Sequence, residues 1–262
     1  IQYYGLLEHL PFLEKFKLLN RKTAEELIRC EIDTHCYEML IGRNFNHRIF
    51  DGSSIYKIPS HQEYLKRSEE QDTDKNLKRF RQDGAYSFFM MHELMPNIKI
   101  YFDIFPDLKV ISIKRNPIGI VYSWFQRGLL RRFGEDPKIF MIPLQSKNGP
   151  VPWYAYRFRN IYHSLSEIEK VILSIKDLFE MYKESYRHLP AKFKKRILLL
   201  PFENFFSQTD ELVIEIGKFL GKKPVKEMPA ILKKVEMPKN GAHSQACLSF
   251  KEATMCYACK LK

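Results

Sequence analysis

The stretch from Lys109 to Gly128, KVISIKRNPIGIVYSWFQRG, constrains the fold more than any other part of the chain. Val110 to Ile113 is a short β-branched run, of the kind that is buried on both faces of a parallel sheet. Pro117 has its φ fixed near the helical value and no N–H to lose, so it suits the first turn of a helix. The stretch therefore predicts a strand, a basic turn and a helix, and open α/β sheets bind their ligands at this end of a strand.

Two polar side chains in this stretch suit an anionic ligand. Arg115 closes the predicted strand, and Ser123 lies two helical turns further on. A guanidinium can fork onto a phosphate, and a helix hydroxyl can donate a second hydrogen bond to it. The pair therefore predicts a phosphate site. The alternative is a surface arginine and a serine that bonds back to its own helix.

The same residues carry a resemblance to a known family. Arg115 to Pro117, Arg-Asn-Pro, with a serine eight positions after the arginine, resembles the 3′-phosphate-binding motif of the sulfotransferases that use PAPS, 3′-phosphoadenosine 5′-phosphosulfate. The resemblance implies an α/β fold, a central parallel sheet flanked by helices, of the P-loop-NTPase-like sulfotransferase type. It assigns Arg115 and Ser123 to the donor's 3′-phosphate, and it implies adenosine 3′,5′-bisphosphate as product. It spans about Tyr86 to Pro224.

A second segment also resembles that family. Tyr86 to Met91 predicts a buried strand whose C-terminal end carries His92 and Glu93. In the sulfotransferases, a strand that ends in a Lys-x-His-Leu-Pro-like sequence supplies the catalytic histidine. Met91 to Pro96 is similar in its histidine, its leucine and its nearby proline, and Arg115 follows the histidine by 23 positions. The lysine that usually precedes the histidine is absent.

Sulfuryl transfer requires a base, because the acceptor hydroxyl or amine loses its proton as it attacks the SO₃ group in line. A neutral imidazole can take that proton, since its unperturbed pKa is about 6.5. We expect His92 to be this base. Glu93 is the alternative, because some sulfotransferases use a carboxylate and strand alternation points only one of the two into the site. A structural histidine is the third interpretation.

The remaining donor and acceptor contacts come from three segments. Arg196 to Leu200 predicts another buried strand, and Phe202-Glu203-Asn204 after it resembles the family's Tyr-Glu-Asp-Leu turn, which assigns Phe202 to the adenine. We expect Arg43, in an irregular loop from Gly42 to Ser60, to face the substrate, with a solvated basic loop as the alternative. Trp153 and Tyr154 predict a stacking wall for a ring, with core packing as the alternative. The acceptor is a small molecule, a lipid or a carbohydrate.

The other elements are predicted to be helical. Thr23 with Glu26 is typical of a capping box that opens a helix. The polar segment from Glu63 to Asp83 predicts an exposed helix or a mobile lid. Further helices are expected over 97–105, 165–186 and 211–220, the last ending at Gly221.

Composition narrows the class of protein. The 262 residues, 45% of them apolar, are enough for the single domain that we expect over 1–262. A net charge of +12 predicts an anionic partner, and we expect no specific nucleic acid. Five cysteines include one CxxC, Cys256 to Cys259, without a second half-site, so we expect no metal. The chain has neither an Asn-x-Ser/Thr site nor an apolar run of a membrane span's length of about 18 residues, which favours a cytoplasmic protein.

One feature of the resembling family is missing. Those enzymes begin their sheet with a strand and a Gly-containing loop whose N–H groups bind the 5′-phosphosulfate. The chain begins at Ile1 rather than at Met, so we expect that strand and loop to lie upstream of residue 1. The alternatives are a degenerate homologue that binds without catalysing, a basic module that binds polyanions or nucleic acid, and a P-loop-like phosphotransferase. The last lacks its GxxxxGK[ST] motif.

Overall fold

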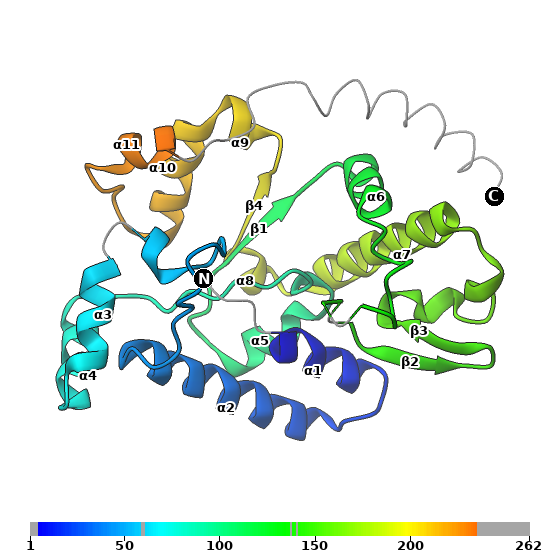
Figure 1. Cartoon of the computed structure of the whole chain (residues 1–262), viewed down its shortest axis with the longest axis horizontal. Coiled ribbons are helices and arrows are strands. Elements are labelled where there is room, and N and C mark those ends of the chain that lie inside the picture. Colours follow the sequence, from blue (N-terminus) through cyan, green and yellow to red (C-terminus); the bar gives the residue numbers. More distant parts are fainter. Residues whose placement is uncertain (1–4, 59–60, 137, 140, 235–262) are drawn as a thin grey trace. The chain divides into compact units, whose positions relative to one another are not determined.

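The computed structural model describes residues 5–58, 61–136, 138–139 and 141–234 (Figure 1). The chain divides into two compact units, one that ends at Ile100 and one that begins at Tyr101. The prediction of a single domain over the whole chain stays a prediction.

The N-terminal unit is helical. Its core lies where the first two helices pack against one another, and the apolar side chains between them are fully covered: Leu7, Phe12, Ala24 and Ile28. The helical elements of this unit are α1 (Gly5–Lys15), α2 (Arg21–Leu40), η1 (Ile55–Lys57), α3 (His61–Glu69), α4 (Thr73–Gln82) and η2 (Met95–Asn97). Helix α5 (Ile98–Ile104) contains the boundary between the units.

Helix α2 begins earlier than its predicted capping box. Asn20 has an extended backbone, and its side-chain oxygen accepts the N–H of Thr23 at 2.9 Å. The predicted pair, Thr23 with Glu26, lies inside the helix. The prediction was wrong because an asparagine three positions before the threonine satisfies the first free N–H groups equally well.

The strand predicted over Tyr86–Met91 is not formed. These residues have no regular structure apart from a single isolated bridge at Met90. Tyr86 and Phe88 are 63% and 59% exposed, and no strand among the described residues covers them. A β-rich composition predicts a strand only where a partner supplies the ladder of hydrogen bonds, and that partner is not local.

The polar segment from Glu63 to Asp83 is helical and exposed, as predicted, since neither α3 nor α4 has a buried residue. The loop that precedes it is irregular, also as predicted, apart from the single turn of η1. Gly42, where this loop begins, has φ +76°, and a Cβ there would lie 2.7 Å from the backbone nitrogen of Ser68. Only glycine fits this close approach of the loop to α3.

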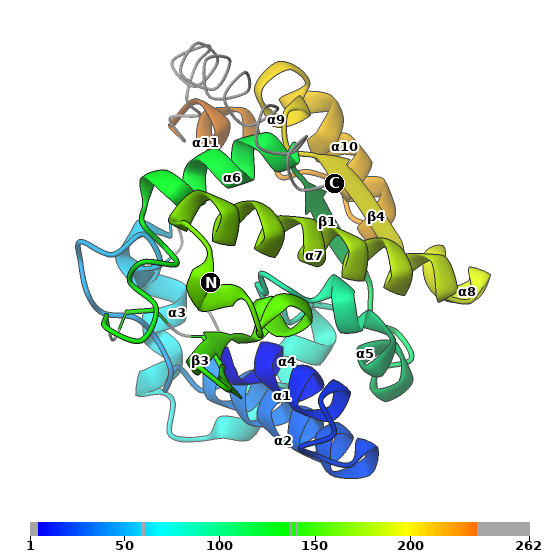
Figure 2. The same cartoon turned by 90° about the vertical axis from the view of Figure 1, so that its right-hand side faces the viewer.

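The C-terminal unit contains the sheet predicted from the two apolar runs. Strand β1 (Val110–Lys114) pairs in parallel with β4 (Ile197–Pro201), and Val110 lies opposite Ile197. Figure 2 shows the two strands side by side. A short antiparallel pair, β2 (Pro143–Ser146) and β3 (Gly149–Pro152), forms a separate ribbon. The described residues are therefore mixed α/β and mostly helical, with a small parallel sheet.

Helix α6 (Pro117–Gln126) follows β1 directly and packs against α7 (Glu167–His188), which buries Val171, Ile175 and Leu178 (Figures 1 and 2). The remaining elements are η3 (Trp153–Phe158), η4 (Tyr162–Ser164), α8 (Ala191–Lys194), α9 (Asn204–Ser207), α10 (Thr209–Leu220) and α11 (Met228–Lys234). Helix α10 ends at Gly221 in the left-handed conformation, φ 69°, as its sequence predicted. Among the described helices, none has the length and apolar character that a membrane crossing requires.

A capping box fixes the start of α7, the helix that supports α6. The Ser166 hydroxyl accepts the Glu169 N–H, and the Glu169 carboxylate accepts the Ser166 N–H at 2.9 Å. We expect Ser166→Ala to lower the free energy of unfolding by about 1 kcal/mol, because it leaves one helix-end N–H without its acceptor. Urea denaturation measures the change. The exposed Ser207 supplies the control Ser207→Ala, and equal losses in the two variants would contradict the cap's contribution.

Candidate functional site

The carboxyl ends of β1 and β4 place two predicted site residues next to each other. Lys114 lies opposite Pro201, so Arg115 and Phe202 leave the sheet at the same edge. The Phe202 N–H donates to the Lys114 carbonyl at 2.8 Å, which continues the ladder by one bond. The Arg115 guanidinium lies 4.9 Å from the centre of the Phe202 ring, over its face. This stacking holds the arginine at the edge of the sheet.

The turn between β1 and α6 is tied to the turn after β4. The Asn116 N–H donates to the Glu203 carboxylate at 2.9 Å, and the Asn116 side chain accepts the Ile118 N–H at 3.0 Å. Pro117, at the first helical position, has no N–H. The N–H groups of Asn116 and Ile118 are thus used within the protein.

Arg115 and Ser123 lie along one face of α6. The Arg115 Nε lies 3.4 Å from where a Cβ on Gly119 would be, so the guanidinium rests on the first turn of the helix. Ser123 follows Gly119 by four positions, which places it on the same face about 6 Å further along the axis. Both residues are half-buried. Their joint role in binding a phosphate stays a prediction.

Glu8, a residue that the sequence did not single out, holds the predicted catalytic turn of the N-terminal unit. Its carboxylate is 5% exposed, and it accepts the backbone N–H groups of both His92 and Glu93, the second at 3.2 Å. The same oxygen lies 3.6 Å from Nδ1 of His92. The His92 side chain is 60% exposed. Glu8 thus fixes the backbone of the turn and one edge of the imidazole, while the rest of the ring faces outward.

Glu93 lies in a different environment from His92. Loss of solvation, followed by the charge of Glu8, raises the pKa of the Glu93 carboxyl from 4.5 to about 8. Glu93 is therefore mostly protonated at neutral pH. A protonated carboxyl donates hydrogen bonds and does not accept a proton, which separates the two predicted candidates for the base by their charge state.

The predicted aromatic wall is covered by protein. Trp153 and Tyr154 are 4% and 3% exposed, and the ring of Tyr154 lies 5.3 Å from that of Trp124 on α6. Both rings pack in the core, and Tyr154 supports the helix that carries Ser123. Their contact with a substrate stays a prediction.

Arg43 is exposed in the irregular loop of the N-terminal unit, with its N–H bonded to the Glu38 carbonyl. Its role toward the substrate stays a prediction. Cys256 and Cys259, the CxxC pair, lie outside the described residues. Within the part of the chain that the structure describes, no three His, Cys, Asp or Glu side chains converge as a metal site would require.

The carboxylates of Glu8 and Glu203, which the sequence analysis did not select, bind backbone N–H groups of the turns that carry the candidate residues. For Glu8, the sequence contains a pattern that could have indicated this role. Glu8 stands in a helix of leucines and phenylalanine, and a carboxylate next to the buried Leu7 is unusual enough to mark a specific partner. Glu203 lies in the Phe202-Glu203-Asn204 turn that resembles the family's Tyr-Glu-Asp-Leu turn, but that resemblance did not indicate its bond to the Asn116 N–H.

The described residues form a mixed α/β protein, mostly helical, with Arg115 at the carboxyl end of a strand in a small parallel sheet. A family model described as "Sulfotransferase domain" matches residues 4–244, so the chain belongs to the sulfotransferase domain family. It is an enzyme of the sulfotransferase class, and the family implies a P-loop-like fold. Members of the family typically use PAPS. No curated protein and no solved structure matches the chain significantly.

The raised pKa of Glu93 predicts a stability that depends on pH. Between about pH 5 and 8, the folded protein keeps a proton that the unfolded chain has lost, so stability falls as the pH rises, by at most about 1.4 kcal/mol per pH unit. Glu93→Gln removes this pH dependence. The free energy of unfolding of the variant, relative to that of the wild type, therefore increases as the pH rises across the same range. Thermal unfolding at several pH values measures the difference. A constant offset between the two proteins would contradict the burial of a neutral Glu93.

Proposed function

We propose that the chain transfers a sulfuryl group from PAPS to a hydroxyl or amine of an acceptor, with the donor's 3′-phosphate bound by Arg115 and Ser123. One observation carries the proposal: the two side chains lie along the same face of α6, at the carboxyl end of β1. Membership of the sulfotransferase domain family supports the choice of donor. The product is adenosine 3′,5′-bisphosphate.

Arg115 is suited to hold the 3′-phosphate in a fixed orientation. Its guanidinium stacks on Phe202 and rests on Gly119, so its freedom is already restricted before a ligand binds. A fork of N–H donors binds two phosphate oxygens at once, and the Ser123 hydroxyl donates to the same group. Phe202 lies next to this position and is our candidate for contact with the adenine.

His92 is our candidate for the general base. In the transfer, the bond between sulfur and the 5′-phosphate oxygen breaks, a bond from the acceptor's oxygen or nitrogen to sulfur forms, and the acceptor's proton moves to the imidazole. The exposed ring of His92 suits this role, whereas Glu93 is protonated at neutral pH. Glu8 is a positioning residue: it binds the backbone of the turn and lies beside Nδ1, which leaves Nε2 to take the proton.

Fewer structural observations bear on the residues that would contact the acceptor. Arg43 is exposed and remains our candidate for a contact with an anionic part of the acceptor. Trp153 and Tyr154 are buried, so we assign them to the support of α6 in the first place and to acceptor contact only through movement of the residues that cover them. The proposal requires no metal, because basic side chains meet the charge of the donor.

The donor site is tested by titrating purified protein with adenosine 3′,5′-bisphosphate. Arg115→Ala and Ser123→Ala each remove a charge-assisted hydrogen bond, which costs roughly 1.5–3 kcal/mol, or about ten- to a hundredfold in affinity. Isothermal titration calorimetry measures the dissociation constants. Arg187→Ala, at an exposed position near the end of α7, is the matched control and leaves the affinity unchanged.

Other outcomes would favour the alternatives. A polyanion-binding module binds many anions with a steep dependence on salt and is indifferent to Arg115 and Ser123. A degenerate homologue binds the bisphosphate but releases none from PAPS with any acceptor. Binding of the bisphosphate that survives both substitutions would overturn the assigned site.

The base is tested with PAPS and an acceptor found by screening, by following release of the bisphosphate. His92→Ala lowers kcat by about a hundredfold or more, whereas Glu93→Gln keeps most of the activity. Glu8→Gln lowers kcat and changes the pH profile, while KM for PAPS stays within about twofold, because it acts through the turn and not on the donor. Inactivation by Glu93→Gln with an active His92→Ala variant would reverse the assignment.

A further inference from the structure

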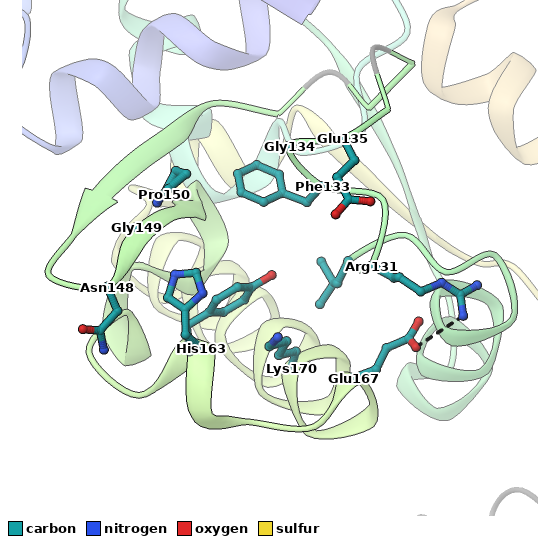
Figure 3. Close-up of a pocket in the computed structure, with 12 residues that line it drawn as sticks. Arg131, Phe133, Gly134, Glu135, Asn148, Gly149, Pro150, His163, Glu167 and Lys170 are labelled. Atoms are coloured by element: carbon teal, nitrogen blue, oxygen red, sulfur yellow. Dashed lines mark ion pairs between the residues drawn. The ribbon is translucent and has the colours of Figure 1, made fainter.

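A second candidate site lies at the start of α7, apart from the residues assigned to the donor. It is a pocket of about 490 Å³ in the C-terminal unit (Figure 3). The loop that follows α6, the turn between β2 and β3, η4 and the first turn of α7 all contribute to it. Because the same loop leaves the helix that carries Ser123, this pocket and the donor residues belong to one connected stretch of the fold.

The charges in the pocket are balanced. Arg131 and Lys170 are cationic, and Glu135 and Glu167 are anionic. Figure 3 shows the ion pair between Arg131 and Glu167, 3.7 Å apart, on one side of the pocket. Lys170 places its ammonium 4.8 Å from the centre of the Tyr162 ring. A balanced set of donors and acceptors does not favour a phosphate or another strongly anionic group, and it suits a neutral ligand with several hydroxyl groups.

The pocket also has apolar surface. Phe133 and Tyr162 are among its lining residues, and Phe133 lies across the pocket from Lys170 and Glu167 in Figure 3. Asn148 and His163 add an amide and an imidazole at another side. Apolar ring faces next to several hydrogen-bonding groups match a sugar, which has C–H faces and a rim of hydroxyls.

Two buried polar atoms among these residues have no hydrogen-bond partner in the part of the chain that the structure describes. They are the hydroxyl of Tyr162, a residue 3% exposed, and Oε1 of Glu167. Burial raises the pKa of Tyr162 to about 12, so its phenol stays protonated and donates. The carboxylate oxygen accepts. Unpartnered buried groups are rare in native proteins, and ligand hydroxyls can both accept from a phenol and donate to a carboxylate.

We propose that this pocket binds a sugar ring of the acceptor. The proposal rests on the proposed function, since it supplies the acceptor class for the sulfuryl transfer. Phe133 contacts a face of the sugar ring, the Tyr162 hydroxyl, Lys170 and Asn148 donate to its hydroxyls, and Glu167 accepts from one of them. A carbohydrate also carries the hydroxyl nucleophile that the transfer requires.

The test measures binding of three disaccharides, maltose, cellobiose and a glucuronate-containing disaccharide, by saturation-transfer NMR and titration. We expect at least one to bind with a millimolar or lower dissociation constant. Tyr162→Phe removes only the hydroxyl and weakens that binding at least fivefold, and Lys170→Ala weakens it about tenfold. Tyr186→Phe and Lys176→Ala, at positions of α7 outside the pocket, are the matched controls and leave it unchanged.

The outcomes separate this proposal from the donor site. Failure of all three sugars to bind, or binding that Tyr162→Phe and Lys170→Ala leave intact, overturns the sugar pocket. Displacement of the bound sugar by a simple phenol such as 4-nitrophenol overturns it in favour of an aryl acceptor. Titration of the same samples with adenosine 3′,5′-bisphosphate reports on the donor site alone. Bisphosphate binding without sugar binding therefore rejects the pocket and retains the proposed function, and the reverse result rejects the donor site.

Discussion

The parallel pairing of β1 with β4 is the interaction on which the candidate site depends. Its register places Lys114 opposite Pro201, so Arg115 and Phe202 emerge together at one edge of the sheet. A slip of one residue would turn every side chain of one strand to the opposite face and would separate the guanidinium from the ring. The bond from the Phe202 N–H to the Lys114 carbonyl extends the pairing to the point where the arginine begins. The sheet is small, but it fixes the positions of Arg115 and Phe202 relative to each other.

In each of the two units, one carboxylate fixes a turn by accepting its backbone N–H groups. Glu203 accepts the N–H of Asn116, 87 positions earlier in the sequence, and Glu8 accepts those of His92 and Glu93, 84 and 85 positions later. Hydrogen bonds from N–H groups to a carboxylate are stronger than those between neutral groups, so each fixes a turn that has no regular structure of its own. The proposed phosphate and base positions therefore both depend on residues remote in sequence. Glu93, whose proton is retained by burial beside Glu8, follows from the same arrangement.

The sequence predicted correctly the elements whose structure is decided by neighbouring residues. The apolar runs at Val110 and Ile197 predicted β1 and β4 to within about a residue, and Pro117 predicted the start of α6, because composition and backbone restriction decide these elements directly. The sequence failed for Tyr86–Met91, whose β-rich composition forms no strand with the residues that the structure describes. It also missed Glu8, because a contact across 84 positions leaves no pattern in either segment. The stacking of Arg115 on Phe202 was likewise not predicted, although both residues had been assigned to the donor.

A crystal structure of the protein with adenosine 3′,5′-bisphosphate would show directly where the donor's 3′-phosphate binds. We predict that it lies within hydrogen-bonding distance of both the Arg115 guanidinium and the Ser123 hydroxyl, with the guanidinium still stacked on Phe202. A bisphosphate bound with its 3′-phosphate away from this face of α6, or held by other basic residues alone, would contradict it.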